Sequence, residues 1–223
     1  MAEPVFSVVI PAYNASGFIV KTLECLNTQK FSDFEAVIIN DGSTDNTEAV
    51  ISEFIAAHPN LRLRLINQNN RGIAGARNRG ISEAKGRYVA FLDHDDFWYL
   101  EKLSKCYEIF SAFPETTVVC HNEALRDASG KIVRYLNYGP YVEGMFRKLL
   151  YKGSCLSTSA TVIKRDVFSE VGLFRENPEF STVEDYDLWL RLSKKHKIYF
   201  LPQVLGEYVL NNKNASLNFE KHY

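Results

Sequence analysis

The stretch YVAFLDHDD, residues 88–96, joins an apolar run to a cluster of carboxylates. Residues 88–92 are apolar and follow the turn formed by residues 85–87 (KGR). A short apolar run of this kind is typical of a strand that is buried on both faces, as in a parallel sheet. Asp93, Asp95 and Asp96 then crowd into four residues where the strand should end. The stretch therefore predicts a buried strand whose carboxyl end carries concentrated negative charge.

Two interpretations of this acidic cluster follow from its chemistry. Neighbouring carboxylates disfavour one another's ionisation, and a bound cation removes that conflict. Carboxylate oxygens suit a hard ion such as Mg²⁺ or Mn²⁺, which is typically shared with substrate phosphates. The alternative is a solvated acidic turn in which Asp95 or Asp96 caps the helix that follows. The stretch alone leaves both interpretations open.

Composition and charge restrict the class of protein. The 223 residues are 46% hydrophobic, which is enough for a sizeable core in one large or two small domains. The formal net charge of −1 gives no electrostatic case for binding nucleic acid. The four cysteines are far apart, so we expect buried, reduced thiols in a cytoplasmic protein, not a zinc or redox site. No signal peptide and no membrane-spanning run is recognisable.

The first half of the sequence alternates strand and helix patterns. Strands are expected at residues 5–10, 34–39, 61–66 and 88–92, with a helix after each of the first three. Ser16 is a candidate cap for the first helix and Thr44 or Asp45 for the second, while the third is expected at about 73–84. Such alternation predicts βαβ units and a parallel sheet. Ligands of such sheets bind at the carboxyl ends of the strands, where residues 12–14, 40–43 and 93–96 form polar clusters.

The second half of the sequence follows a different pattern. Strands are expected at residues 118–120, 131–135, 157–163 and 198–201, the second returning on the first as a hairpin and the last ending before Pro202. Helices are expected at residues 145–151 and 184–195, the latter with Leu188, Trp189 and Leu192 facing inward. The basic residues of the shorter helix, Arg147, Lys148 and Lys152, either touch an anionic lipid surface or form a solvated face, the commoner case. The change near residue 115 is not a linker, so we expect one continuous domain.

Six segments, in this order, resemble the family 2 glycosyltransferases. They are residues 8–14 (VVIPAYN), 40–45 (NDGSTD), 70–78 (NRGIAGARN), 86–88 (GRY), 91–96 (FLDHDD) and 183–189 (VEDYDLW). The resemblance covers about residues 5–210 and implies the nucleotide-diphospho-sugar transferase fold called GT-A, an α/β fold with a mixed, mostly parallel central sheet flanked by helices. It implies a single domain over residues 1–223, with a nucleotide-sugar-binding half (1–115) and an acceptor-side half (116–223).

The resemblance places the donor nucleotide at the strand ends. Tyr13 matches the family's residue beside the base, Asp41 the residue that hydrogen-bonds the base, usually uracil, and Arg77 a residue near the base and the diphosphate. Pro11 and Asp93 complete the implied donor site. Each position also has a structural alternative: a Tyr packed at a helix entry, an Asp in a turn, and an exposed helix Arg.

The resemblance also implies a Mn²⁺ or Mg²⁺ ion. Asp95 would ligate the ion that holds the diphosphate, and Asp93 would contact the ribose or share the ion. His94 would be a spacer between them. Asp96 would either support the ligands or cap a helix.

An acidic pair matches the family's catalytic position. Asp185 would be the base that takes the proton from the acceptor hydroxyl during inverting transfer, with Glu184 beside it. The alternative is that both residues only stabilise the N-terminus of a helix. One departure from the family lies near the end of the chain, where the usual Arg and His close to the diphosphate are missing and asparagines occupy positions 211, 212 and 214.

The implied function is inverting, metal-dependent transfer of a sugar from a nucleotide-diphospho-sugar, with UDP expected, to a hydroxyl of a glycan or lipid-linked acceptor. We expect a role in polysaccharide synthesis for a bacterial-type cell envelope, in the cytoplasm or peripherally at the inner face of the membrane. The alternative is a non-catalytic sugar-nucleotide-binding protein. A nicotinamide-dependent dehydrogenase is excluded, because residues 11–14 are not the glycine-rich turn that such enzymes need.

Overall fold

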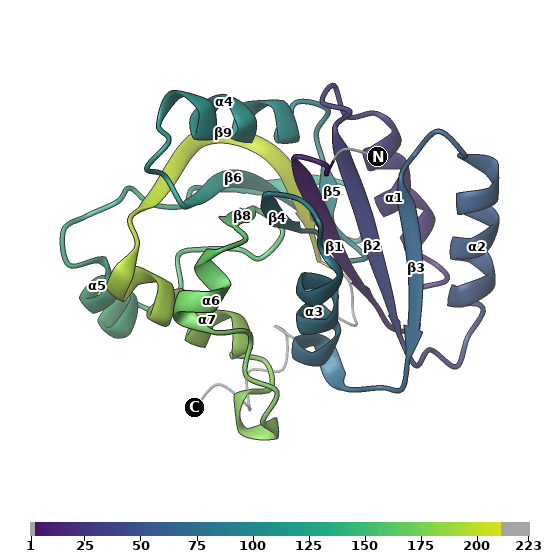
Figure 1. Ribbon diagram of the computed structural model, residues 1–223. Helices are drawn as coiled ribbons and strands as arrows, with labels where there is room; N and C mark the ends of the chain where they lie inside the picture. Colours follow the sequence, from purple (N-terminus) through teal and green to yellow (C-terminus); the bar gives the residue numbers. More distant parts are fainter. Residues whose placement is uncertain (1–2, 211–223) are drawn as a thin grey trace.

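The computed structural model describes residues 3–210, which form an α/β arrangement around one sheet (Figure 1). In chain order the elements are β1 (Phe6–Ala12), α1 (Ile19–Asn27), β2 (Phe34–Asp41), α2 (Thr47–Ala57), β3 (Leu63–Gln68), α3 (Gly72–Glu83), β4 (Tyr88–Phe91), β5 (Phe97–Trp98), α4 (Lys102–Ala112), β6 (Val118–Arg126), β7 (Ile132–Leu136), α5 (Met145–Lys152), β8 (Thr161–Lys164), α6 (Val167–Val171), the 3₁₀ turn η1 (Pro178–Phe180), α7 (Glu184–Lys195) and β9 (Ile198–Val209).

The sheet is mixed, with most strands pointing the same way. The strand order is β3-β2-β1-β4-β8-β6-β9-β5, and β7 pairs with β6 outside this path. The strands β1 to β4 are mutually parallel, as expected for βαβ units. Since β8 runs antiparallel to both β4 and β6, those two strands share one direction, and β9 is parallel to β6. The pairing of β4 with β8 joins the two halves of the chain in one sheet.

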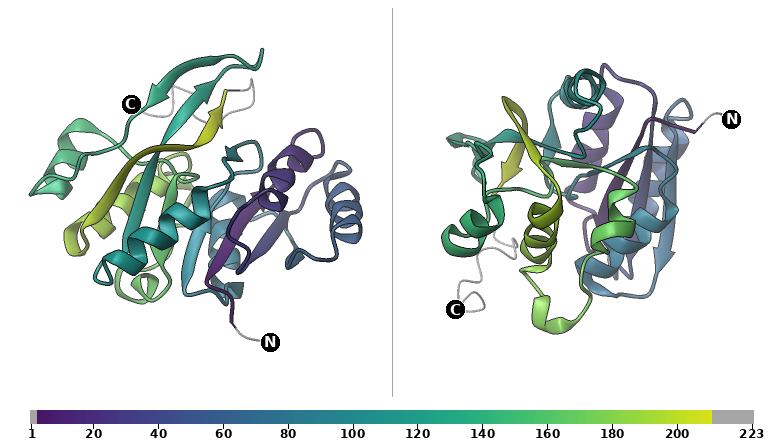
Figure 2. Two further views of the ribbon diagram at one scale, coloured as in Figure 1. Left: turned by 90° about the horizontal axis from the view of Figure 1, so that it is seen from above. Right: turned by 60° about the vertical axis from the view of Figure 1, so that its left-hand side comes forward.

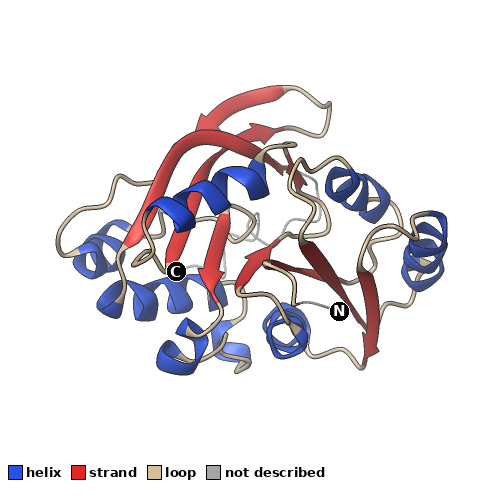
Figure 3. Ribbon diagram, turned by 45° about the horizontal axis from the view of Figure 1, so that its top comes forward, coloured by secondary structure: helices blue, strands red, loops and turns tan. Residues whose placement is uncertain are grey.

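Helices cover both faces of the sheet (Figure 3). Successive side chains of a strand point to opposite faces. Because helices cover both faces, every residue of β1 and β4 is buried. Val8 and Ile10 pack in a core with residues of α1, α2 and α4, while Val9 and Phe91 pack in a second core with residues of α3, α5, α6 and α7. The apolar run at residues 88–92 is therefore buried on both faces, as predicted.

Some details of the predicted elements were wrong. Ser16 does not cap α1, which begins at Ile19, and its hydroxyl donates to Asp45 instead (2.7 Å). The last strand does not stop before Pro202 but continues to Val209. A register shift against β6 leaves residues 202 and 203 outside the ladder, so the missing N–H of the proline costs no ladder hydrogen bond.

Other expectations for individual elements were confirmed. The helix over Glu184–Lys195 has the predicted bounds, and Leu188, Trp189 and Leu192 are fully buried in it. The strand β7 returns on β6 as a hairpin.

All four cysteines are free thiols, three of them buried and Cys155 partly exposed. Within residues 3–210, no helix combines the length and the apolar character needed to cross a membrane.

Candidate active site

A cavity of about 940 Å³ opens at the carboxyl ends of β1, β2 and β4. Its lining includes every position that the sequence proposed for donor, metal or catalysis: Pro11, Tyr13, Asp41, Arg77, Asp93, Asp95, Glu184 and Asp185. The lining also includes Leu136 of β7, Tyr138 just after it, and Leu156, Ser157 and Thr158 of the segment before β8. Positions that are far apart in sequence thus share one concave surface.

The β1 and β2 ends of the cavity carry an exposed ring and a buried carboxylate. Tyr13 follows β1 directly and is 47% exposed, so the alternative of a packed tyrosine is wrong. Asp41 ends β2 and is 2% exposed. Its Oδ1 accepts from the Gln68 amide (2.7 Å) and from the Arg71 N–H (2.9 Å). These bonds fix the orientation of the Asp41 carboxylate toward the N-terminus of α3.

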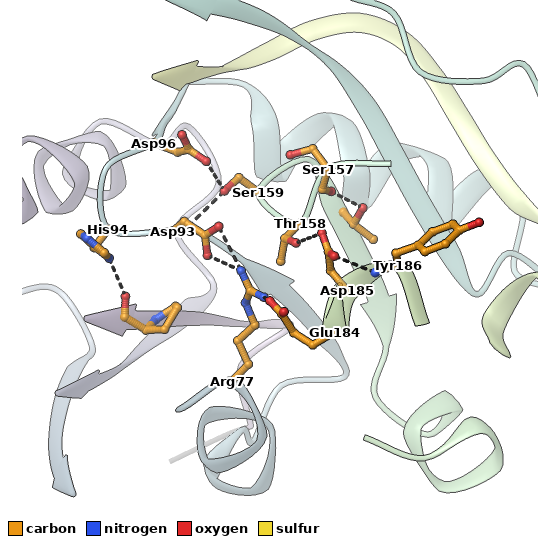
Figure 4. Close-up of polar contacts among 12 residues, drawn as sticks. Arg77, Asp93, His94, Asp96, Ser157, Thr158, Ser159, Glu184, Asp185 and Tyr186 are labelled. Carbon is orange, nitrogen blue, oxygen red and sulfur yellow. Dashed lines mark hydrogen bonds and ion pairs between the residues drawn. The ribbon is translucent and has the colours of Figure 1, made fainter. Parts of the chain in front are cut away.

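Arg77 ties the acidic loop after β4 to the start of α7 (Figure 4). Its guanidinium donates to both oxygens of Asp93 (2.9 and 3.1 Å) and to Glu184 Oε1 (2.9 Å). The side chain is almost fully buried and lies over the Phe174 ring, so the alternative of an exposed helix arginine is wrong. Burial disfavours its charged form, but Asp93, Glu184 and Asp185 together hold the Arg77 pKa above its ordinary value. Its charge is therefore already shared between two carboxylates before any ligand binds.

Ser159 lies between Asp93 and Asp96 and joins these two residues of the acidic loop (Figure 4). Its hydroxyl accepts from the Asp93 N–H (3.1 Å) and donates to Asp96 Oδ2 (2.6 Å). The other oxygen of Asp96 accepts from the Val209 N–H (3.1 Å). No helix begins at Asp96, because β5 follows it, so the helix-cap interpretation is wrong for this residue. Asp96 instead fixes the loop to β9.

The carboxylates of this loop disfavour one another's ionisation. Burial raises the Asp96 pKa well above its ordinary value, and the nearby Glu123, Asp93 and Asp95 carboxylates raise it further. His94 turns the other way, with Nδ1 at 3.2 Å from the Pro11 carbonyl oxygen, which joins the loop to β1.

The residues that line the cavity fit a hard divalent cation. Asp93 and Asp95 offer carboxylate oxygens on one wall, and the electrostatic strain on Asp96 is of the kind that a cation relieves. Among the described residues no group of three or more His, Cys, Asp or Glu side chains is arranged to hold an ion. Mg²⁺ bound with substrate phosphates is commonly held by only one or two carboxylates, with the remaining ligands from phosphate and water.

Asp185 lies in the first turn of α7, across the cavity from the acidic loop. Its Oδ1 accepts from the Tyr186 N–H (2.7 Å), and its Oδ2 lies 3.4 Å from the Thr158 hydroxyl. Burial, followed by the Glu184 charge, raises the Asp185 pKa from 3.8 to about 6, although Arg77 opposes this shift. A carboxylate of this pKa accepts a proton more readily than an ordinary aspartate near neutral pH.

Three residues at or beneath the cavity wall were not predicted from the sequence: Thr158 and Thr182, which line the cavity, and the buried Ser159. Ser159 and Thr158 belong to a hydroxyl run that we included in the strand expected at 157–163, whereas β8 begins only at Thr161. Thr182 has a left-handed φ of 75°, and its buried Oγ1 has no hydrogen-bond partner within residues 3–210. The available signal was three consecutive hydroxyl residues in a strand otherwise expected to be apolar. The expected departure at the asparagines 211, 212 and 214 lies outside the described residues.

The chain is similar in sequence to several known glycosyltransferases. The chain is 33% identical to the amylovoran biosynthesis glycosyltransferase AmsB of Erwinia amylovora, covering 93% of this chain and 70% of AmsB. It is 32% identical to the chondroitin synthase of Escherichia coli over 96% of this chain, and 27% identical to an uncharacterized glycosyltransferase of Rickettsia felis over 98%. The chain spans only 30% and 36% of those two longer proteins.

Solved structures show the same fold. S. aureus TarS 1-349 in complex with UDP-GlcNAc superposes with a TM-score of 0.77 at 20% identity, covering 96% of this chain and 60% of that chain. The mannosyltransferase PcManGT of Pyrobaculum calidifontis, in complex with GDP-Man and Mn²⁺, gives 0.73 at 18% identity, covering 100% and 61%. These likenesses confirm the predicted GT-A fold. The model of the family described as "Glycosyl transferase family 2" matches residues 7–172, and the chain belongs to that family.

Proposed function

We propose that this chain is an inverting, metal-dependent glycosyltransferase that moves a sugar from a UDP-sugar to a hydroxyl of a glycan or lipid-linked acceptor. One observation carries the proposal. Asp185, whose pKa is raised to about 6, faces the same cavity as the carboxylates Asp93 and Asp95. A proton acceptor opposite a cation-binding wall is the arrangement that inverting sugar transfer requires.

The proposed reaction is a single displacement. The acceptor oxygen attacks the anomeric carbon from the face opposite the diphosphate, while its proton passes to an oxygen of Asp185. The bond from the anomeric carbon to the diphosphate oxygen breaks, and its electron pair leaves with UDP. The Tyr186 N–H, which donates to Asp185 Oδ1, keeps the second oxygen of that carboxylate for the proton.

In this proposal, Asp95 and Asp93 hold the divalent ion. When bound, the ion neutralises the negative charge that develops on the departing diphosphate. Arg77 holds Asp93 in place and at the same time fixes Glu184, the neighbour of the base. Tyr13 stacks on the base of the nucleotide, and Asp41 accepts from its ring N–H.

The choice of donor and acceptor rests on relatives. TarS has been solved with UDP and with UDP-GlcNAc, whereas PcManGT has been solved with GDP-Man and Mn²⁺. AmsB and the chondroitin synthases are named for polysaccharide synthesis. We therefore propose a UDP-linked donor and a glycan acceptor bound against residues 116–223, within a single domain. The free thiols support a cytoplasmic location.

A donor screen followed by variant assays tests this function. Thermal shift with a panel of UDP- and GDP-sugars and Mn²⁺ identifies the donor, because a ligand of the native state raises the melting temperature. Release of nucleoside diphosphate from that donor is then compared between the wild type, Asp185→Asn and Asp187→Asn. Asp187 is a matched control, because it lies on the same helix turn but pairs with Arg191 (2.7 Å).

Loss of release only in Asp185→Asn supports catalysis. A wild type that binds UDP but releases nothing from any donor is instead the non-catalytic binding protein. For the metal ligand, Asp95→Ala should abolish Mn²⁺-dependent UDP binding in calorimetry, while Asp33→Ala, an exposed acidic control, leaves it intact. Unchanged UDP binding by Asp95→Ala, with and without chelator, would assign the ion to other residues.

A further inference from the structure

The exposed side of α5 is both apolar and basic. Met145 and Leu149 are buried and face the core. Residues three and four apart share one face of a helix, so Arg147, Leu150 and Tyr151 form a stripe on the opposite side. Tyr151 is 79% exposed and Leu150 is 48% exposed. Large apolar side chains are thus presented outward next to positive charge.

The loop before α5 extends this surface. Tyr141 and Val142 are each 38% exposed. The Lys148 ammonium lies 3.3 Å from the Pro140 carbonyl oxygen, a contact that ties the loop to the helix. Loop and helix therefore form one continuous region, which we call the α5 surface: Tyr141, Val142, Arg147, Leu150, Tyr151 and Lys152.

Charge separates this region from the rest of the chain. Residues 140–152, which make up the loop and helix of the α5 surface, contain three basic residues and one acidic residue, a formal charge of +2, whereas the whole chain carries −1. Exposed apolar side chains interleaved with Lys and Arg are the pattern of segments that lie in the interface of an anionic membrane. Tyrosine in particular settles at the level of the lipid headgroups.

We propose that the α5 surface docks this protein on an anionic phospholipid bilayer. Leu150 and Tyr151 enter the boundary between headgroups and acyl chains, while Arg147 and Lys152 pair with lipid phosphates. A second copy of the chain is a poorer occupant. In a two-fold contact the same patch meets itself, so the positive charges of each α5 would face those of the other.

The position of the α5 surface also suits the cavity. Leu136 and Tyr138 line the cavity just before this segment, and Leu156 and Ser157 line it just after. Figure 2 shows α5 at the margin of the molecule, away from α1 and α2. A docked protein would therefore present the acceptor end of the cavity close to the lipid, a consequence that rests on the proposed function. The docking itself does not, since it is measured without donor or acceptor.

Vesicle co-sedimentation tests the proposal. The full chain is mixed with vesicles of phosphatidylcholine alone or with 30% phosphatidylglycerol, at low and at high salt. The test variant is Tyr151→Ser/Lys152→Glu. Its matched control is Val20→Ser/Lys21→Glu on α1, where an exposed apolar residue also precedes an exposed lysine. Circular dichroism and light scattering verify the fold and the oligomeric state of each variant.

The wild type and the α1 variant should bind the anionic vesicles at least tenfold more tightly than the neutral ones, because each basic residue near the surface contributes about fivefold. High salt should weaken that binding, and the α5 variant should lose about tenfold or more. Equal binding by the α5 and α1 variants would overturn the proposal, as would a wild type that ignores anionic vesicles at low salt. A wild-type dimer that the α5 variant dissociates would assign the surface to a second copy.

Discussion

Replacing Asp185 by Asn should stabilise the protein above pH 7 while it removes activity. The folded state raises the Asp185 pKa from 3.8 to about 6, so ionisation of this side chain opposes folding. Each pKa unit corresponds to about 1.4 kcal/mol, which gives at most about 3 kcal/mol for the shift of about two units. Asn is close in shape and carries no charge, so it escapes this cost while its side-chain oxygen still accepts from the Tyr186 N–H.

The pH dependence of this stabilisation distinguishes it from simple repacking. Because the folded pKa is raised, the favourable contribution of protonated Asp185 is complete below about pH 4 and is lost as pH rises through about 6. The difference between Asp185→Asn and wild type should therefore be near zero at pH 4, grow between pH 4 and 6, and level off above pH 7. Urea unfolding at four pH values measures it, with ΔG and m fitted separately.

Asp187→Asn serves as the control variant. Asp187→Asn breaks the ion pairs with Arg191 and Arg175, so it should lower stability at pH 8 instead of raising it. If Asp185→Asn destabilises the protein at pH 8, or raises stability equally at pH 4 and pH 8, ionisation of Asp185 does not lower the stability of the folded state as inferred. That outcome would also remove the physical reason for treating this carboxylate as a tuned base.

Three further changes test the Arg77 pairing, the packing of α3 on β1 and the exposed ring of Tyr13. Arg77→Met should lower the free energy of unfolding by about 3–5 kcal/mol at pH 7.5, because it leaves two paired carboxylates without their counter-charge, and a loss below about 1 kcal/mol in urea unfolding would refute this. Gly80→Ala should cost about 1–3 kcal/mol, since its Cβ would overlap the Val9 side chain, and the double change with Val9→Ala should recover much of the loss. Tyr13→Ala should weaken UDP binding about tenfold in calorimetry with little change in melting temperature, whereas unchanged affinity would show that the exposed ring does not stack on the base.

Much of the fold could be predicted because its determinants are local. α7 has acidic residues in its first turn, lysines in its last turn and apolar residues at helical spacing, and its bounds matched the prediction. The strand-end rule for parallel sheets predicts that Tyr13, Asp41 and Asp93 lie near one another, and all three line the cavity. The continuation of β9 past Pro202 could not be predicted, because it depends on a register shift against β6 that only the pairing reveals.

The contacts within the site were harder to predict for the same reason. Arg77 pairs with residues 16 and 107 positions away, so its burial could not be inferred from an arginine on a helix pattern. Ser159 donates a hydrogen bond to Asp96, which is 63 positions away in the sequence. The raised pKa of Asp185 depends first on burial, which sequence alone does not specify. Residue types at strand ends were predictable, whereas the partners that set their charge and orientation were not.

If Asp185 is the base of a sugar transfer, the rate of nucleoside diphosphate release must follow the ionisation of this carboxylate. With the donor chosen by thermal shift and Mn²⁺ held constant, the wild-type rate should rise with pH through about 6 and then level off. Asp185→Asn should be slower by about a hundredfold or more, without that rise. A variant that keeps both the wild-type rate and the wild-type pH profile would show that Asp185 is not the base.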